Sequence, residues 1–328
     1  MCCCSIMDAA YADVRVVLRS TACEYTRRDR EIERMSEYQY YEFHAIDRSL
    51  TDQQMRELRS CSTRARITRT SFINDYSWGR FKGNEDAWME KYFDAFIYVA
   101  NWGTQALKLR LPSRLLDLKI AQEYCVGDSF HAWESRGNII VSFVSEEEGE
   151  WDWVEHDGII SPVLPVRTEL VQGDLRALYI GWLLCVQHGE LDDEDVEPAV
   201  PPGLGQLSES LESLVSFLRI DEHLLSAAAR SSATMNEVQW SQDEVRVWVA
   251  GLPVVEKDNV LARLIVDEDL TLVTELLQRF RRDRDGIGRA SNAPATRRAV
   301  GELRRAAQAH AKQWRQTKAK ARGGSTTP

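Results

Sequence analysis

Residues 38–112 decide the fold, opening with YQYYEFHAIDR (38–48) and closing with ALKLRLP (106–112). In the opening segment, aromatic and apolar residues alternate with Glu42 and His44, which is the period of a half-buried strand. In the closing segment, leucines alternate with two basic residues, and a proline then ends the run. Both ends of the stretch are therefore predicted to be β-strands.

A helix with a complete start signal follows the first strand. Thr51 is placed as the N-cap and Gln54 as the third helical residue, so their side chains satisfy amides at the helix start. Leu50 and Met55 are placed as a hydrophobic staple around this cap. Residues 67–76 (ITRTSFINDY) are rich in β-branched and aromatic residues and predict the next strand.

Residues 85–100 are predicted to form a second, longer helix. Their large apolar residues fall into two neighbouring rows at a spacing of three and four, and Gly103 follows as a helix-ending residue. The whole stretch is then β-α-β-(β)-α-β. This order favours a split β-α-β sheet that resembles the ferredoxin-like plan.

The rest of the chain divides into an added strand hairpin, a buried helix and a helical C-terminal half. NIIVSFV (138–144) predicts a strand that follows a hairpin turn, and residues 168–187 predict the most apolar helix. An α+β domain followed by a small all-α bundle is therefore expected. The expected boundaries are a disordered extension at 1–34, the α+β domain at 35–189, an acidic and Pro-rich linker at 190–206, a helical domain at 207–283, a flexible break at 284–295, and a basic helical tail with a disordered end at 296–328.

Composition limits the class of protein. An apolar fraction of 44% across 328 residues excludes global disorder and leaves room for two domains. The seven cysteines are odd in number and contain no C-x-x-C pair, which predicts free thiols in a reducing, cytoplasmic compartment.

No apolar run is long enough for a bilayer, so no membrane partner is expected. Acylation of Cys2–Cys4 is an alternative, but no polybasic partner accompanies these residues.

Four phrases carry a resemblance to a group of uncharacterised bacterial proteins. They are MSEYQYYEFHAIDRSLT, ARITRTSFINDYSWGRFKGN, YFDAFIYVANWGT and LRALYIGWLLCVQHGELDDED. The resemblance covers residues 35–282, and the chains of that group start at the equivalent of Met35. It implies no activity. Relatives continue into a charged helical tail balanced between Glu and Arg, whereas this tail is basic and ends in GGSTTP, so its C-terminal end is expected to depart from the family pattern.

Four tryptophans beside turns or in an acidic segment are candidate partner-binding residues: Trp78, Trp102, Trp151 and Trp153. Exposed indoles at loops anchor protein partners. The alternative is ordinary packing, in which the indoles cover a helix end, a core or a hairpin.

The basic tail is the strongest functional signal. Residues 279–322 hold fourteen Lys and Arg against three acidic residues, while the whole chain has a net charge of −10. Such a segment neutralises phosphates and binds nucleic acid in a salt-sensitive way. The candidate polyanion-binding residues are Arg297, Arg298, Arg304, Arg305, Lys312, Arg315, Lys318, Lys320 and Arg322.

No catalytic, cofactor-binding or metal-binding residue is predicted. The six histidines form no H-x-H or i+4 pair, and neither Cys nor His residues cluster at metal-ligand spacing. His44 near Asp47 suggests a base–carboxylate pair, although a solvated strand face explains it as well. The first hypothesis is a non-catalytic interaction or scaffold protein acting through a protein partner or self-association. The alternatives are a nucleic-acid-binding protein that uses the basic arm and an enzyme with a dispersed site.

Overall fold

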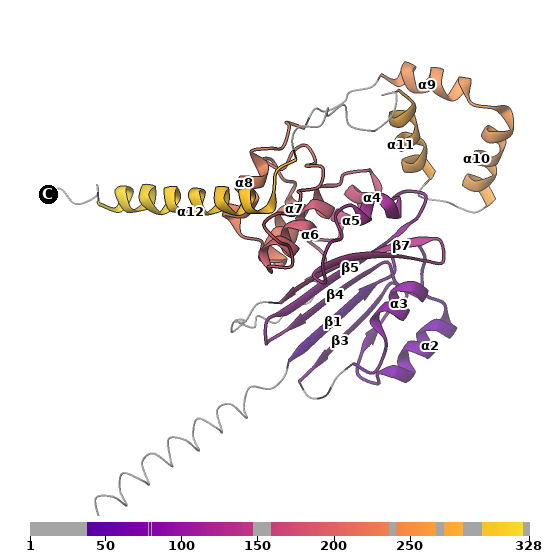
Figure 1. The fold of residues 1–328 in the computed structure, drawn as a ribbon. Helices are drawn as coiled ribbons and strands as arrows, with labels where there is room; N and C mark the ends of the chain where they lie inside the picture. The colour runs from indigo at the N-terminus through magenta and orange to yellow at the C-terminus, as the bar shows by residue number, and fades with distance from the viewer. Residues whose placement is uncertain are drawn as a thin grey trace, which may run out of the picture.

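The computed structural model describes residues 38–77, 79, 81–146, 159–235, 241–266, 272–284 and 297–323, with the side chains of residues 282 and 320–323 left out. Within these ranges the chain forms one seven-stranded sheet and eleven helices (Figure 1). The predicted mixed fold with a helical C-terminal half is confirmed at this level. The extension before residue 35 and most of the break at 284–295 lie outside the described residues.

The sheet is antiparallel throughout. Its strands are β1 (Gln39–His44), β2 (Arg66–Ile67), β3 (Ser71–Tyr76), β4 (Ala95–Ala100), β5 (Thr104–Pro112), β6 (Phe130–Ser135) and β7 (Asn138–Glu146). They lie in the order β2-β3-β1-β4-β5-β7-β6, and each neighbouring pair is antiparallel. The ferredoxin-like plan is not confirmed, because a split β-α-β unit places its two parallel strands on either side of a third strand, whereas β1 and β3, with α2 between them in the chain, are direct antiparallel neighbours.

Some of the helices pack on the faces of the sheet, and others come after its last strand in the chain. The helices are α2 (Asp52–Cys61), α3 (Glu85–Lys91), α4 (Leu118–Gln122), α5 (Pro165–Val171), α6 (Arg176–Gln187), α7 (Glu209–Phe217), α8 (Glu222–Ala229), α9 (Gln242–Gly251), α10 (Val254–Val266), α11 (Leu272–Arg284) and α12 (Val300–Gly323). No helix among the described residues has the length and apolar character needed to cross a membrane.

The predicted start of the first helix is confirmed. The amide of Gln54 donates to the Thr51 hydroxyl at 3.2 Å, and the Gln54 side-chain oxygen accepts from the Thr51 amide at 2.8 Å. This reciprocal pair is a capping box, and it fixes the point where α2 begins. The predicted strands at both ends of the 38–112 stretch are confirmed as β1 and β5.

The predicted helix over residues 85–100 is wrong. α3 ends at Lys91, and residues 95–100 (AFIYVA) form β4 between β1 and β5. A strand covered on both faces has a continuous apolar sequence, so its pattern does not distinguish it from a buried helix. The apolar rows that predicted one helix belong to a short helix and a central strand.

The predicted helix over residues 168–187 is also divided. α5 ends at Val171 and α6 begins at Arg176, with Gly173 between them at a φ of +88°. That backbone conformation favours glycine, because a side chain strains it. The break separates α5 from α6, and residues of both helices belong to the same apolar core.

Two apolar cores lie on opposite faces of the sheet. One contains Phe43, Phe72, Phe96 and Trp88 and is covered by α2 and α3. The other is larger and includes the leucines of β5, almost all of α6, and residues of α7, α8 and the first turn of α12. The predicted boundary between an α+β domain and a helical bundle stays a prediction, but α7, α8 and the start of α12 share their core with the sheet.

A buried ion pair holds the turn between α3 and β4. Arg110 on β5 donates to the Oδ1 atom of Asp94 from Nε at 3.0 Å and from Nη2 at 2.6 Å. The other oxygen of Asp94 accepts from the amides of Ile46 at 2.6 Å and Asp47 at 2.9 Å. Asp94 is fully buried, so these four bonds compensate its desolvation.

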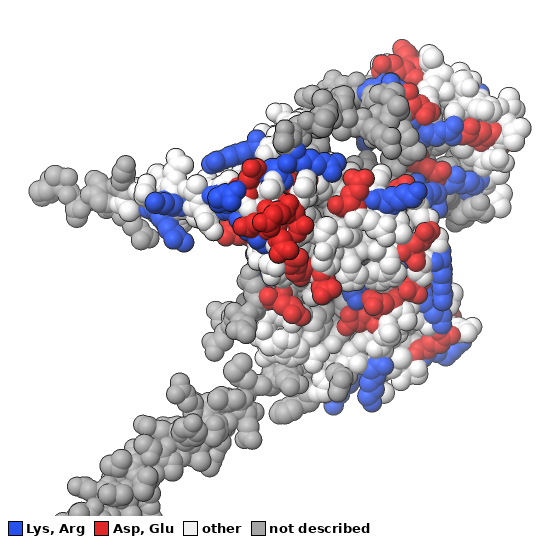
Figure 2. Space-filling model, viewed as in Figure 1, with Lys and Arg blue, Asp and Glu red and all other residues white. Residues whose placement is uncertain are grey.

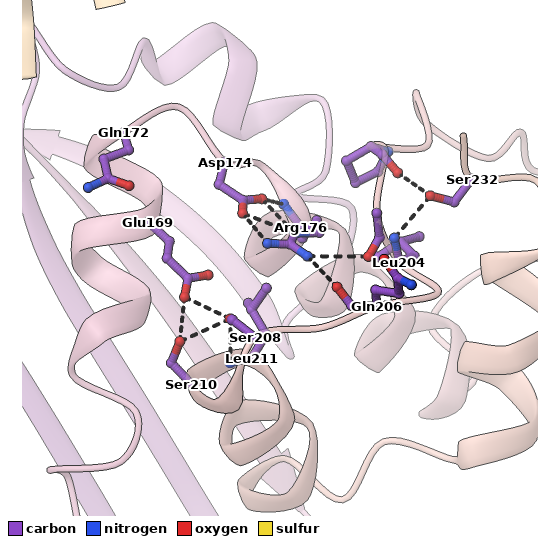
Figure 3. Close-up of polar contacts among 12 residues, drawn as sticks. Glu169, Gln172, Asp174, Arg176, Leu204, Gln206, Ser208, Ser210, Leu211 and Ser232 are labelled. Carbon is purple, nitrogen blue, oxygen red and sulfur yellow. Dashed lines mark hydrogen bonds and ion pairs between the residues drawn. The ribbon is translucent and has the colours of Figure 1, made fainter. Parts of the chain in front are cut away.

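Polar side chains also attach the segment expected to be a linker (Figure 3). Arg176 pairs with Asp174 at 2.6 Å and donates to the carbonyls of Gly203 at 3.2 Å and Gln206 at 2.9 Å. The Ser208 hydroxyl, which caps α7, donates to Glu169 on α5 at 2.7 Å. The approach to α7 is therefore fixed to the helices that cover the sheet.

Candidate interaction surfaces

Helix α11 joins the α9–α10 pair to the rest of the molecule. Leu272 and Phe280 on α11 are buried, and Gln278 donates to the carbonyls of Val171 and Leu115. Trp248 on α9 packs its ring 5.6 Å from that of Phe280. Helices α9 and α10 lie outside α11, at the edge of the molecule (Figure 1).

The face of α10 that meets α11 is charged. Arg263 on α10 pairs with Glu275 on α11 at 2.6 Å, and Glu256 on α10 pairs with Arg279 on α11. No residue of α10 is buried. Ion pairs, and not an apolar core, therefore hold α10 against its neighbour.

The opposite face of α10 is exposed and mostly apolar, with Asp258 among its residues. Leu261 lies two residues before Arg263, which is a rotation of about 200° around the helix. Val254 and Ile265 share this face with Leu261, since they lie two turns before it and one turn after it. These three residues and the flanking Val255, Leu264 and Val266 are between 49% and 77% exposed. We call the six residues the outer α10 face.

This arrangement reverses that of an ordinary surface helix, which turns its apolar stripe toward the core and its charges toward water. Val247 on α9 and Val273 on α11 are also exposed. An exposed, mostly apolar helix face of this kind marks interaction sites in folded proteins. The sequence predicted helices here from apolar spacing but not this surface, because the spacing does not say which side of a helix its neighbours cover.

One of the four candidate tryptophans lies in the described part of the chain. Trp102 is 45% exposed in the turn between β4 and β5, and its Nε1 donates to the Thr104 hydroxyl at 3.0 Å. Trp78, Trp151 and Trp153 lie outside the described residues. A partner-binding role for Trp102 stays a prediction.

The basic tail begins with residues that bind the body. Arg298 donates to Glu197 from Nε at 2.9 Å and from Nη2 at 2.7 Å, and the Tyr179 hydroxyl donates to the same buried carboxylate. Arg304 pairs with Asp193 at 2.8 Å. Among the candidate polyanion-binding residues, Arg298 and Arg304 are therefore engaged in holding α12.

The remaining described cations of the tail point to solvent. Arg297, Arg305, Lys312, Arg315 and Lys318 are exposed, and only Lys318 has a ring contact, with its ammonium 4.2 Å from the ring centre of Trp314. Figure 2 shows basic side chains on the projecting helix and acidic side chains gathered on the body next to its base. The side chains of Lys320 and Arg322 lie outside the described residues.

The structure also brings together three residues that the sequence did not connect. Ser129, His188 and Glu190 line a pocket of about 400 Å³ with Asp128, Val144 and Glu146. The Ser129 hydroxyl lies 2.6 Å from Nδ1 of His188 and 2.5 Å from Glu190. The hydroxyl is thus between the histidine and the carboxylate.

This order differs from that of a hydrolytic triad, in which histidine lies between serine and the acid. Both oxygens of Glu190 also accept from the Ser129 amide, at 3.1 and 3.2 Å. The cluster fastens the start of β6 to the end of α6, and it supports no acyl-transfer mechanism. Among the described residues, no group of three or more His, Cys, Asp or Glu side chains is placed to hold a metal ion.

Comparisons with known proteins identify no relative. No protein-family model, no curated protein and no solved structure matches the chain.

Proposed function

We propose that this chain is a non-catalytic interaction protein that self-associates through the outer α10 face. The observation that carries the proposal is the orientation of α10, whose Glu256 and Arg263 pair with α11 while Val254, Leu261 and Ile265 face water. A cytoplasmic location, expected from the cysteine pattern, belongs to the same proposal.

Burial of this face is energetically favourable. Removing apolar surface from water contributes roughly 25 cal/mol per Å². Val254, Leu261 and Ile265 are each more than half exposed and lie in one row with the exposed Asp258, so a facing helix covers the three apolar side chains and this carboxylate together. The ion pairs to α11 stay in place during such docking, because they lie on the other side of α10.

A second copy of the chain is the occupant that this geometry favours. Two-fold dimers are the commonest closed assemblies, and they need one surface that is complementary to itself. A row of aliphatic side chains along a single exposed helix meets that requirement, because the same row on another copy packs against it. A different protein with an apolar helix face is the alternative partner.

Sedimentation velocity over a wide concentration range tests the proposal. The wild-type chain is expected to shift from monomer to dimer as concentration rises. The double variant Leu261→Gln/Ile265→Gln is expected to stay monomeric, because both side chains lose their apolar surface while glutamine keeps a good helix propensity.

The matched control is Ile46→Gln/Ile120→Gln, which removes two exposed isoleucines far from α10 in the sequence. It is expected to dimerise as the wild type does. A wild-type chain that stays monomeric at every concentration would overturn self-association. Dimerisation that persists unchanged in the α10 variant would instead overturn the role of this face.

A further inference from the structure

Helix α12 has two different sides. Leu303, His310 and Trp314 recur at spacings of seven and four and face α8, where the rings of His310 and Trp314 lie 5.2 and 5.6 Å from that of His223. Arg305 and Lys312 are two residues away from Leu303 and Trp314 respectively, on the opposite side of the helix. α12 therefore has one packing side and, away from it, a basic side with Arg305, Lys312 and Arg315, while the exposed Lys318 lies one turn after Trp314 at the edge of the packing side.

The first turn of α12 is firmly attached. Val300 and Leu303 are buried, and the amides of Val300 and Gly301 donate to the carbonyls of Asp195 at 2.9 Å and Asp193 at 3.0 Å. The bonds of Arg298 and Arg304 to the acidic segment add to this attachment. The helix is thus anchored at one end.

The other end projects from the body (Figure 1). Every side chain described from Lys312 to Ala319 is exposed. Residues 312–323 extend for about 18 Å at the rise of an α-helix. No acidic residue follows Glu302 in the sequence, whereas Arg305, Lys312, Arg315 and Lys318 are exposed cations without an ion pair among the described residues.

We propose that the basic side of α12 binds the phosphate backbone of double-stranded nucleic acid. Exposed Lys and Arg along one helix neutralise phosphates and release counterions, which favours binding without sequence selection. The rest of the chain is acidic and repels a polyanion. A basic surface therefore attracts nucleic acid best where it projects away from the acidic body. This inference is independent of self-association through α10.

Other anionic ligands fit this helix less well. A helix that lies on a membrane needs a face of large apolar residues, and between residues 311 and 323 Trp314 is the single such residue. A single strand is bound by stacking on aromatic rings, but Trp314 already contacts His223. Binding to the phosphates of a duplex requires only exposed Lys and Arg side chains.

Fluorescence anisotropy with labelled DNA and RNA duplexes, measured on the full chain at several salt concentrations, tests the proposal. With four phosphate contacts, affinity is expected to fall about 100-fold between 50 and 200 mM salt. The variant Lys312→Gln/Arg315→Gln/Lys318→Gln is expected to weaken binding at least about tenfold and to reduce the salt slope by about 3.

The matched control is Arg56→Gln/Arg64→Gln/Lys119→Gln, which removes the same charge from exposed residues of the body. It is expected to bind as the wild type does. Absence of duplex binding at 50 mM salt would overturn the proposal, as would equal losses in the two triple variants. Binding to anionic vesicles or to polyglutamate in preference to duplex would also overturn it.

Discussion

Arg263 on α10 and Glu275 on α11 form an ion pair with 2.6 Å between Nη2 and Oε2, and this pair sets the orientation of α10. Because the charged side of the helix meets its neighbour, Leu261 and Ile265 are left on the outside. The proposed function depends on this one relationship between two helices.

Substitutions on the outer α10 face are predicted to leave the stability of the fold nearly unchanged. Leu261→Gln/Ile265→Gln is expected to change the free energy of unfolding by less than about 1 kcal/mol, because exposed substitutions cost little. Urea denaturation of the monomer at low concentration measures this. A loss of several kcal/mol would mean that the two side chains are packed within the chain.

Attachment of α12 is predicted to depend on Arg298. The substitution Arg298→Ala leaves the buried carboxylate of Glu197 without its cation and is expected to cost about 3–5 kcal/mol where α12 meets the body. Hydrogen exchange of the α12 amides measures the effect. The neighbouring exposed residue provides the control, since Arg297→Ala is expected to leave exchange unchanged; equal exchange in both variants would contradict the assignment.

The turn between α3 and β4 is predicted to depend on Asp94. Asp94→Asn keeps the shape of the side chain but removes the charge that pairs with Arg110, and about 3–5 kcal/mol of stability is expected to be lost. Asp86→Asn breaks the ion pair between Asp86 and Lys108. The Asp86 side chain is more than half exposed, so this substitution is expected to cost less than about 1 kcal/mol of stability. Chemical denaturation of both variants compares them.

Glu57 is predicted to titrate far below an ordinary glutamate. The hydroxyl of Tyr92, then the Lys91 ammonium and the Gln53 amide, donate to its carboxylate and lower its pKa from 4.5 to about 2. A lowered pKa in the folded state means that the contribution of Glu57 to stability is present above pH 4.5 and is lost as pH falls toward 2. NMR titration of the Glu57 carboxyl carbon is expected to show the low midpoint.

The same titration on Tyr92→Phe separates the cause. Without the tyrosine hydroxyl, the midpoint of Glu57 is expected to rise toward 4.5, because the largest contribution to its lowered pKa is gone. A midpoint near 4.5 in the wild type, or one that does not move in Tyr92→Phe, would show that this bond does not form.

The sequence predicted local structure well where the residues themselves carry the signal. Thr51 and Gln54 mark the start of α2, and the alternation through Lys108 and Arg110 marks β5. Continuous apolar runs were less informative, because residues 95–100 satisfy the pattern of a buried helix and that of a central strand alike. Tertiary pairing with β1 and β5 decides between the two.

The interaction surfaces were predictable in part. The basic tail is evident from charge alone, but the engagement of Arg298 and Arg304 with Glu197 and Asp193 depends on contacts about one hundred residues apart. The outer α10 face was not predicted at all. An amphipathic pattern shows that a helix has an apolar and a polar side, but it does not show which side packs against another helix and which side faces water.

Hydroxyl-radical footprinting of the full chain at low and high concentration tests the central claim most directly. In the dilute chain, Leu261 and Ile265 are expected to be oxidised rapidly, since both are more than half exposed. At high concentration, these two residues are expected to become protected while Ile46 and Ile120 stay reactive. Slow oxidation of Leu261 and Ile265 in the dilute chain, or oxidation of both that stays equally rapid at high concentration, would contradict the account.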